Sequence, residues 1–330
     1  MWRTIVTSAI SVDWTFVRRR TGWLVPMAFI GLTTIVVLKY VNTPTWLGFD
    51  ASLYAAASAA WIGGADPWAV SQAGIYYAAP PPTLLAFVPF AWLPPLLVSV
   101  IWIFGSFGLA WLAIRTLRLP IWWLAFPPLV DASLVGNPDV AVLALLVVGG
   151  GRLGALAPFF KIYAIVPMVG ERRWRQFAVS LVLLAASWFV LPWATWLAQL
   201  PIITAHLIKT SATTSVFGQP ILMAVAVIAL LSIGFRRAGW LAVPLLWPYT
   251  QFHYAAISVP GLSPYLALAW CFPTPEVWLG STCLFALHQR VFAGARGPGT
   301  SGRGSPHAVA ESSSASYRPG ATKIDPSSSE

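Results

Sequence analysis

The chain has 330 residues, of which 58% are hydrophobic and only 9% are charged, and its formal net charge is +10. A mean hydropathy of +0.72, with the apolar residues gathered in repeated runs, indicates an integral membrane protein and excludes an ordinary water-soluble domain. The positive charge does not indicate nucleic-acid binding, because the basic residues form short clusters between apolar runs, as cytoplasmic loops do. The clusters are Arg18–Arg20, Arg172–Arg175, Arg236–Arg237 and the segment from Arg290 onward.

The first apolar segment, Trp23–Val41, is long enough to cross a hydrocarbon core of about 30 Å at about 1.5 Å per residue. Three arginines precede it, and no small-residue cleavage site follows at Lys39–Pro44. We therefore expect a retained helix rather than a signal peptide, with residues 1–22 as a cytoplasmic N-terminus.

The next segment, residues 42–80, contains no run able to span and is predicted to be a loop on the far, extracytoplasmic side. A short amphipathic helix within this loop would lie in the plane of the membrane interface and would end at Gly63-Gly64. The residues that form its apolar stripe at helical spacing are Leu53, Ala56, Ala57, Ala60 and Trp61.

Further apolar segments predict an all-α polytopic bundle of about nine to eleven transmembrane helices within residues 23–289. After residue 290 the chain is rich in Gly, Ser, Pro and Ala, which predicts a disordered tail over 290–330. The last apolar segment has an expected break at Pro273–Pro275. In chain order the segments are Thr83–Leu93, Leu96–Ile114, Ile121–Val135, Val140–Gly150, Leu153–Val169, Phe177–Leu197, Ile221–Ile233, Trp240–Pro260 and Leu262–His288.

Alternating the sides through these segments keeps the later arginine clusters inside, as the positive-inside rule requires. The same alternation leaves Arg115, Arg118 and Arg152 on the far side, either as exceptions or as binders of an anion. If Thr83–Leu93 is re-entrant instead of spanning, the orientation of the middle segments reverses.

Asp50 is the first candidate for chemistry, because a carboxylate beside a membrane-length segment is costly in a chain with so few acids. Its competing interpretation is an N-cap for a helix beginning near Ala51, a role for which Asp is favoured. Asp131 and Asp139 lie at the ends of apolar segments, where snorkelling or capping is the simpler interpretation.

Lys161 lies within an apolar segment, where a lysine costs about 2.5–3.5 kcal/mol and usually faces a cavity or a partner. A lipid phosphate and an internal ion pair are both open as that partner. His253 is either a satisfied core histidine or a ligand-binding residue, and Arg152 is either a headgroup anchor or a donor contact.

A series of short motifs runs along the chain: Gly48-Phe49-Asp50, then Gly63–Trp68, Tyr77–Leu85, Gly136–Asp139, Phe160–Pro167 and Trp247–Tyr254. Over roughly residues 40–265, their order and spacing resemble those of glycosyltransferase family 87, a family of the GT-C superfamily. Departures from the family pattern include Trp68, Asn137-Pro138 and Phe252.

The resemblance implies a GT-C-type bundle that transfers a sugar, usually mannose, from a polyprenyl-phosphate donor to an envelope glycolipid or glycan hydroxyl, with inversion. Asp50 would be the general base on the extracytoplasmic face of a bacterial plasma membrane, with no metal and no cofactor. Lys161, His253, Arg152 and Tyr163 would bind the donor and its phosphate. The substrate groove would include Tyr77, Pro81, Asn137 and Asp139.

Two other classes of function are open on the residues alone. A transporter or flippase of a lipid-linked sugar also needs a lipid groove and intramembrane cations, although it usually has repeated halves, and the sequence shows no convincing repeat. A non-catalytic membrane subunit of an envelope-assembly complex is the other alternative.

Overall fold

The computed structural model describes residues 23–210 and 213–295, and those up to Val291 form one compact unit. The predicted cytoplasmic N-terminus, residues 1–22, and most of the predicted tail lie outside the described residues. Helix α17 includes residues 290–295, so the first part of the predicted tail is helical.

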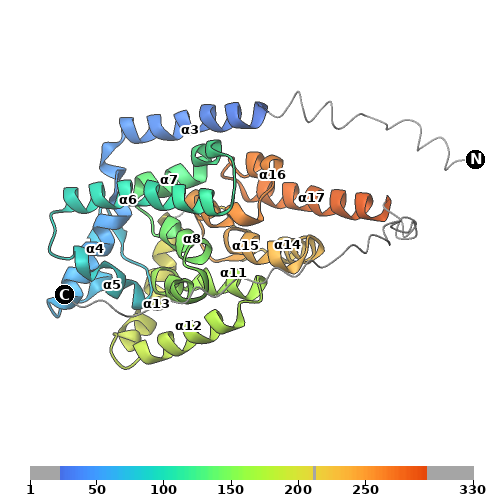
Figure 1. Cartoon of the computed structure of the whole chain (residues 1–330). Coiled ribbons are helices and arrows are strands. Elements are labelled where there is room, and N and C mark those ends of the chain that lie inside the picture. Colours follow the sequence, from blue (N-terminus) through green and yellow to red (C-terminus); the bar gives the residue numbers. More distant parts are fainter. Residues whose placement is uncertain (1–22, 211–212, 296–330) are drawn as a thin grey trace, which may run out of the picture. The chain divides into compact units, whose positions relative to one another are not determined.

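The described part is built almost entirely of helices, which confirms the all-α class (Figure 1). The exception is a hairpin of two antiparallel strands, β1 (Ser71–Gln72) and β2 (Ile75–Tyr76). The α-helices are α3 Leu24–Asn42, α4 Phe49–Ile62, α5 Pro82–Phe87, α6 Pro95–Thr116, α7 Pro127–Val135, α8 Asp139–Val147, α9 Gly150–Leu153, α10 Ala157–Phe160, α11 Ile165–Gly170, α12 Trp174–Ser187, α13 Trp193–Thr210, α14 Pro220–Ser232, α15 Phe235–Leu246, α16 Pro264–Ala269 and α17 Pro275–Ala295. The 3-10 helices are η1 Pro44–Trp46, η2 Pro67–Ala69, η3 Val88–Phe90, η4 Ile121–Ala125, η5 Gly154–Leu156, η6 Ile162–Ala164 and η7 Phe252–Gly261.

Two described helices, α3 and α6, are long and apolar enough to cross a membrane, and the bent pair α7–α8 counts as a third if it forms one broken span. The count of nine to eleven spans stays a prediction. Large apolar side chains are exposed on α3 and α6, as on a lipid-facing surface; examples are Ile35, Leu96 and Phe104.

Several predicted segments are interrupted, because proline and glycine end their helices early. Thr83–Leu93 contains only the six-residue α5 followed by η3, which is too short to span by itself. Leu153–Val169 is divided among η5, α10, η6 and α11, and the break between α10 and η6 falls at Lys161. The expected interruption near Pro273 is confirmed, since α16 ends at Ala269 and α17 begins at Pro275.

The predicted loop helix is present as α4, but it is packed into the protein rather than lying free. Ala51, Leu53, Ala55 and Ala57 are buried, and α4 contacts α5 and α6. The adjacent α7 and α8 bend by 117° at their connection, so that this turn reaches the start of α4, where the Gly48 N–H donates to Leu134 O at 2.8 Å.

The described arginines lie at element ends remote from α4. Helix α6 starts beside Gly48, whose carbonyl accepts from the Ser99 hydroxyl at 3.3 Å. It ends at Thr116, next to Arg115 and two residues before Arg118. Helix α8 likewise starts beside α4 and leads away to Arg152. If α5 does not span, the conflict with the positive-inside rule does not arise, since these arginines share one end with the later clusters.

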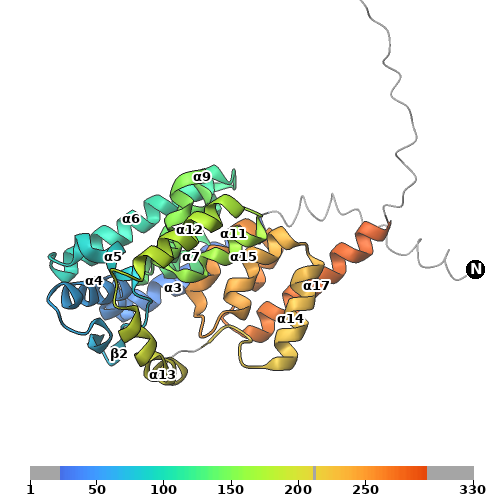
Figure 2. The same cartoon turned by 90° about the horizontal axis from the view of Figure 1, so that it is seen from below.

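That remote end is held together by one acid, Glu171, at the turn between α11 and α12. Its carboxylate pairs with Arg173 and Arg236, the second at 3.5 Å, and it accepts from the Trp240 Nε1–H at 2.8 Å. Arg173 also donates to the Leu146 carbonyl near the end of α8. These contacts tie α8, α12 and α15 together. In Figure 2 the turn between α11 and α12 lies at the end of α12 away from α4.

Candidate functional site

Asp50 lies in the first turn of α4, and its carboxylate faces the interior of the protein rather than capping the helix. The N-cap residue is Gly48, whose φ of +65° favours glycine, and an added Cβ there would lie 2.2 Å from Ser99 Cβ. The Asp50 Oδ2 instead accepts from the Asn137 Nδ2–H at 2.6 Å. The interpretation of Asp50 as an N-cap is therefore wrong.

Asn137 lies in the turn between α7 and α8, which Gly136 forms with a φ of +77°. Its Oδ1 accepts from the Asp139 N–H at 3.1 Å, and its Nδ2 lies 3.0 Å from His253 Nε2 as well as beside Asp50. One amide thus joins α4, the turn before α8 and η7. The structure brings together three of the predicted residues through it.

His253 is buried at the start of η7, and its Nδ1 lies 3.7 Å from Asp131 Oδ2. Asp131 is only 4% exposed, and its Oδ1 accepts from the Tyr40 hydroxyl at 2.9 Å and from the Lys39 Nζ at 3.4 Å. Asp131 lies inside α7, so the prediction that it snorkels or caps at a segment end is wrong. Sequence reasoning assigned no role to Tyr40.

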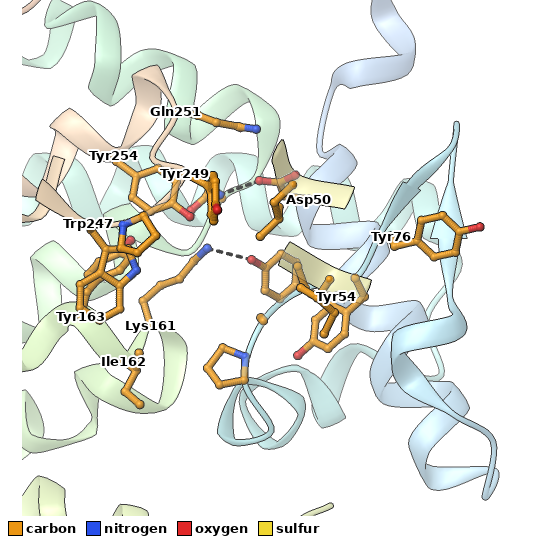
Figure 3. Close-up of a pocket in the computed structure, with 18 of the residues that line it drawn as sticks. Asp50, Tyr54, Tyr76, Lys161, Ile162, Tyr163, Trp247, Tyr249, Gln251 and Tyr254 are labelled. Carbon is orange, nitrogen blue, oxygen red and sulfur yellow. Dashed lines mark hydrogen bonds between the residues drawn. The ribbon is translucent and has the colours of Figure 1, made fainter. Parts of the chain in front are cut away.

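Lys161 is 7% exposed, and its ammonium lies between the rings of Tyr54 and Tyr254, 5.4 and 5.2 Å from their centroids. Its Nζ donates to the Tyr54 hydroxyl at 2.8 Å (Figure 3). Among the described residues no carboxylate lies within ion-pair distance of this ammonium. Burial is expensive for a lysine that has no carboxylate in direct contact.

Tyr54 shares the buried environment of Lys161. Burial raises the pKa of the Tyr54 phenol well above its ordinary value, against the opposing effect of the Lys161 charge. The phenol therefore stays neutral and accepts the lysine hydrogen bond without neutralising the ammonium.

Tyr163 and Asp139 form a buried hydrogen-bonded pair. The Tyr163 hydroxyl donates to Asp139 Oδ1, and the Tyr163 ring packs against Trp247 and Tyr254. Asp139 Oδ2 is buried with no hydrogen-bond partner among the described residues. Asp139 does not line the cavity described next.

Two cavities meet at Asp50. The first, called the Lys161 cavity, has a volume of about 350 Å³ and is lined by α4, residues 75–80, Lys161–Tyr163, α13 and residues 247–254. The second, called the Lys39 cavity, has a volume of about 800 Å³ and is lined by α3, α7 and residues 251–253 and 271–273. The residues that line both are Asp50, Ile75, Gln251 and His253.

The other predicted residues fall into two groups. Tyr77 lines the Lys161 cavity, 1% exposed and packed edge-on against Tyr54. Pro81 precedes α5 and Arg152 lies in α9, and neither is among the residues that line the two cavities. Within the described residues no group of three or more His, Cys, Asp or Glu is placed to hold a metal ion.

Comparison of the chain with models of known families, with curated proteins and with solved structures finds no match in any of the three.

Proposed function

We propose that this protein is a membrane glycosyltransferase that moves a sugar from a polyprenyl-phosphate donor to a hydroxyl of an envelope glycolipid or glycan. The observation that carries the proposal is the position of Asp50, whose carboxylate lies where two separate cavities meet. A two-substrate transfer with one general base needs this arrangement, because the base must touch the acceptor while the donor approaches from the other side.

The Lys161 cavity suits the donor phosphate and sugar. A buried ammonium with no carboxylate partner among the described residues is the type of group that stabilises a leaving phosphate. Tyrosine and tryptophan rings on its walls offer flat apolar faces with polar edges, as a sugar ring requires. Its volume lies within the usual range of about 300–1,000 Å³ for small-ligand sites.

The Lys39 cavity suits the acceptor. Two carboxylates, Asp50 and Asp131, and the His253 imidazole face it, and such groups recognise hydroxyls. Part of its α3 wall, formed by Leu32, Ile35 and Val36, is apolar, so the lipid part of a glycolipid has a matching surface.

In the proposed step, Asp50 removes the proton of an acceptor hydroxyl while that oxygen forms a bond to the anomeric carbon. The bond from the anomeric carbon to the phosphate oxygen breaks, and its electron pair leaves with the polyprenyl phosphate beside Lys161. The proton remains on Asp50 until it is released to solvent. Attack from the face opposite the leaving group inverts the anomeric centre.

The charge distribution supports an extracytoplasmic site. The described arginines lie at the end remote from Asp50, and the positive-inside rule assigns that end to the cytoplasm. A bundle of nine to eleven membrane-embedded elements of GT-C type, mannose as the sugar and a bacterial plasma membrane are the remaining parts of the proposal, and they rest on the resemblance to glycosyltransferase family 87.

The test is transfer from radiolabelled polyprenyl-phosphate mannose in membranes that contain the Asp50→Asn variant at wild-type abundance. We expect a loss of about 10²–10⁴-fold, the usual contribution of a general base. Asp66→Asn is the matched control: it lies in the same loop, lines neither cavity, and retains its hydrogen bond to Trp68 because Asn caps as well as Asp. Its second partner, the Gln199 amide, can rotate to present its oxygen to the new NH₂.

Two outcomes would overturn the proposal. Asp50→Asn with near wild-type transfer would remove Asp50 as the base. Movement of a lipid-linked sugar across proteoliposome membranes without transfer, at equal rates in wild type and Asp50→Asn, would identify a transporter instead.

A further inference from the structure

The orientation of the Asn137 amide determines which nitrogen of His253 carries the proton. Asn137 Oδ1 accepts from the Asp139 N–H, so Nδ2 is the atom that faces both Asp50 and His253. An amide nitrogen donates and does not accept. His253 Nε2 must therefore be the acceptor, and the imidazole proton lies on Nδ1, toward Asp131.

Asp131 is held so that one of its oxygens is reserved for His253. The Tyr40 hydroxyl and the Lys39 ammonium both donate to Oδ1, and Oδ2 is left facing the imidazole at 3.7 Å. A buried carboxylate with two donors on one oxygen stays ionised and attracts the Nδ1–H.

We propose that Asp131 is a positioning residue, which fixes His253 in its Nδ1-protonated form and, through Asn137, holds the Asp50 carboxylate between the two cavities. The chain of contacts runs from α3 through α7 and η7 to α4. The tautomer assignment stands on the geometry alone. Its effect on catalysis rests on the proposed function.

Acidification should break this chain of contacts. Burial disfavours a charge on His253, whereas Asp131, Asp139 and Asp50, which surround it from α7, α8 and α4, favour an imidazolium. Lys39 of α3 lies beyond Asp131. The Asn137 amide disfavours the imidazolium form of His253, because a proton on Nε2 would face the Asn137 N–H. Once His253 binds a second proton, Asn137 must turn away and Asp50 loses its hydrogen bond.

The Asp131→Asn variant tests the assignment sharply. Tyr40 and Lys39 both donate, so the new amide keeps its oxygen toward them and turns its NH₂ toward His253 Nδ1. Two N–H groups cannot face each other, so the imidazole proton should move to Nε2. Asn137 must then turn its NH₂ away from His253, and Asp50 loses its hydrogen bond. The same type of Asp→Asn change at a serine-protease triad produces the wrong histidine tautomer.

The first measurement is nitrogen-15 NMR of the full chain labelled at histidine, in lipid nanodiscs. The chain has four histidines, and the His253→Gln variant identifies the signal of His253 by its loss. We expect an Nδ1-protonated neutral ring in wild type and an Nε2-protonated ring in Asp131→Asn. An Nε2-protonated ring or an imidazolium in wild type at neutral pH would overturn the inference, whatever the enzyme assay shows.

The second measurement is the transfer rate. Asp131→Asn should lower kcat by about 10–100-fold through misplacement of Asp50, with KM for the donor unchanged. In a His253→Leu background the same substitution should have little further effect, because the group through which it acts is gone. Equal effects in both backgrounds would show that Asp131 acts by another route. Absence of transfer in wild type, with the NMR result as expected, would count against the proposed function alone.

Discussion

At the residue scale, the candidate site contains two charged groups, Asp50 and Lys161, that differ in their hydrogen-bond and charge partners. Asp50 has a hydrogen-bond donor in Asn137, whereas the Lys161 ammonium has the neutral Tyr54 hydroxyl and two aromatic rings. Buried cations without a counter-charge are rare and are usually retained for binding. Lys161 is therefore expected to contribute to donor binding, while Asp50 contributes to the chemical step.

Replacement of Lys161 by Met should raise KM for the polyprenyl-phosphate donor by about 10–100-fold, because a hydrogen bond to a charged group contributes about 1.5–3 kcal/mol. Thermal unfolding should shift little or upward, since the variant no longer buries an unpaired ammonium. KM and Tm would be measured on the same purified sample.

Tyr54→Phe is the matched variant for Lys161→Met. It removes the 2.8 Å hydrogen bond but keeps the ring and the ammonium, so the donor KM should rise only several-fold. A larger effect from Tyr54→Phe than from Lys161→Met would mean that the phenol, not the ammonium, contacts the donor.

At the scale of elements, the turn between α7 and α8 forms the site. It lies against the start of α4, and Gly136 allows the contact: an added Cβ would lie 3.0 Å from Ala51 Cβ and 3.1 Å from Gly48 Cα. Because the turn also contains Asn137, a small displacement there moves the donor of the hydrogen bond to Asp50.

Gly136→Ala should lower both Tm and transfer activity, through strain at positive φ and through the contact with α4. The strain alone is about 1–2 kcal/mol. Gly64→Ala separates the two effects, because Gly64 has a φ of +76° and open space around its Cβ position. If both variants lose activity equally, the close approach to α4 is not what positions the site.

Element boundaries also show where hydropathy was misleading. The runs Leu153–Val169 and Trp240–Pro260 are largely apolar in sequence, yet each contains a break at or near a polar residue, Lys161 in the first and His253 in the second. Pro158 and Pro248 lie a few residues before Lys161 and His253, and these prolines are the feature of the sequence that indicates a helix end there. The partners across each break are distant in sequence, so no local pattern could identify them.

At the scale of the whole molecule, the separation of the arginines from Asp50 predicts a single orientation. In a variant without the native Cys271 and Cys283, an Ala65→Cys substitution in the loop near the site should react with an impermeant maleimide on intact cells. Thr116→Cys, at the far end of α6, should react only after permeabilisation.

This pair of positions discriminates between two topologies. If Thr83–Leu93 crosses the membrane, Thr116 and Ala65 lie on the same side and label together. Separate labelling agrees with a non-spanning α5. Labelling of Thr116→Cys alone on intact cells would reverse the orientation and remove the extracytoplasmic site.

The sequence by itself predicted the membrane class, the first helix and the loop helix, and it identified Asp50 and Lys161 as candidate site residues. These follow from the free energy of transferring individual residues out of water, which depends on local composition. Only the tertiary structure decided that Asn137 and His253 meet at Asp50, that Asp131 and Tyr40 support them, and that two cavities share this point. Contacts between residues 87 and 116 positions apart depend on the bend at Gly136 and on how α3, α4, α7 and η7 pack. Transfer free energies of single segments do not contain that information, because packing is a property of all the elements together.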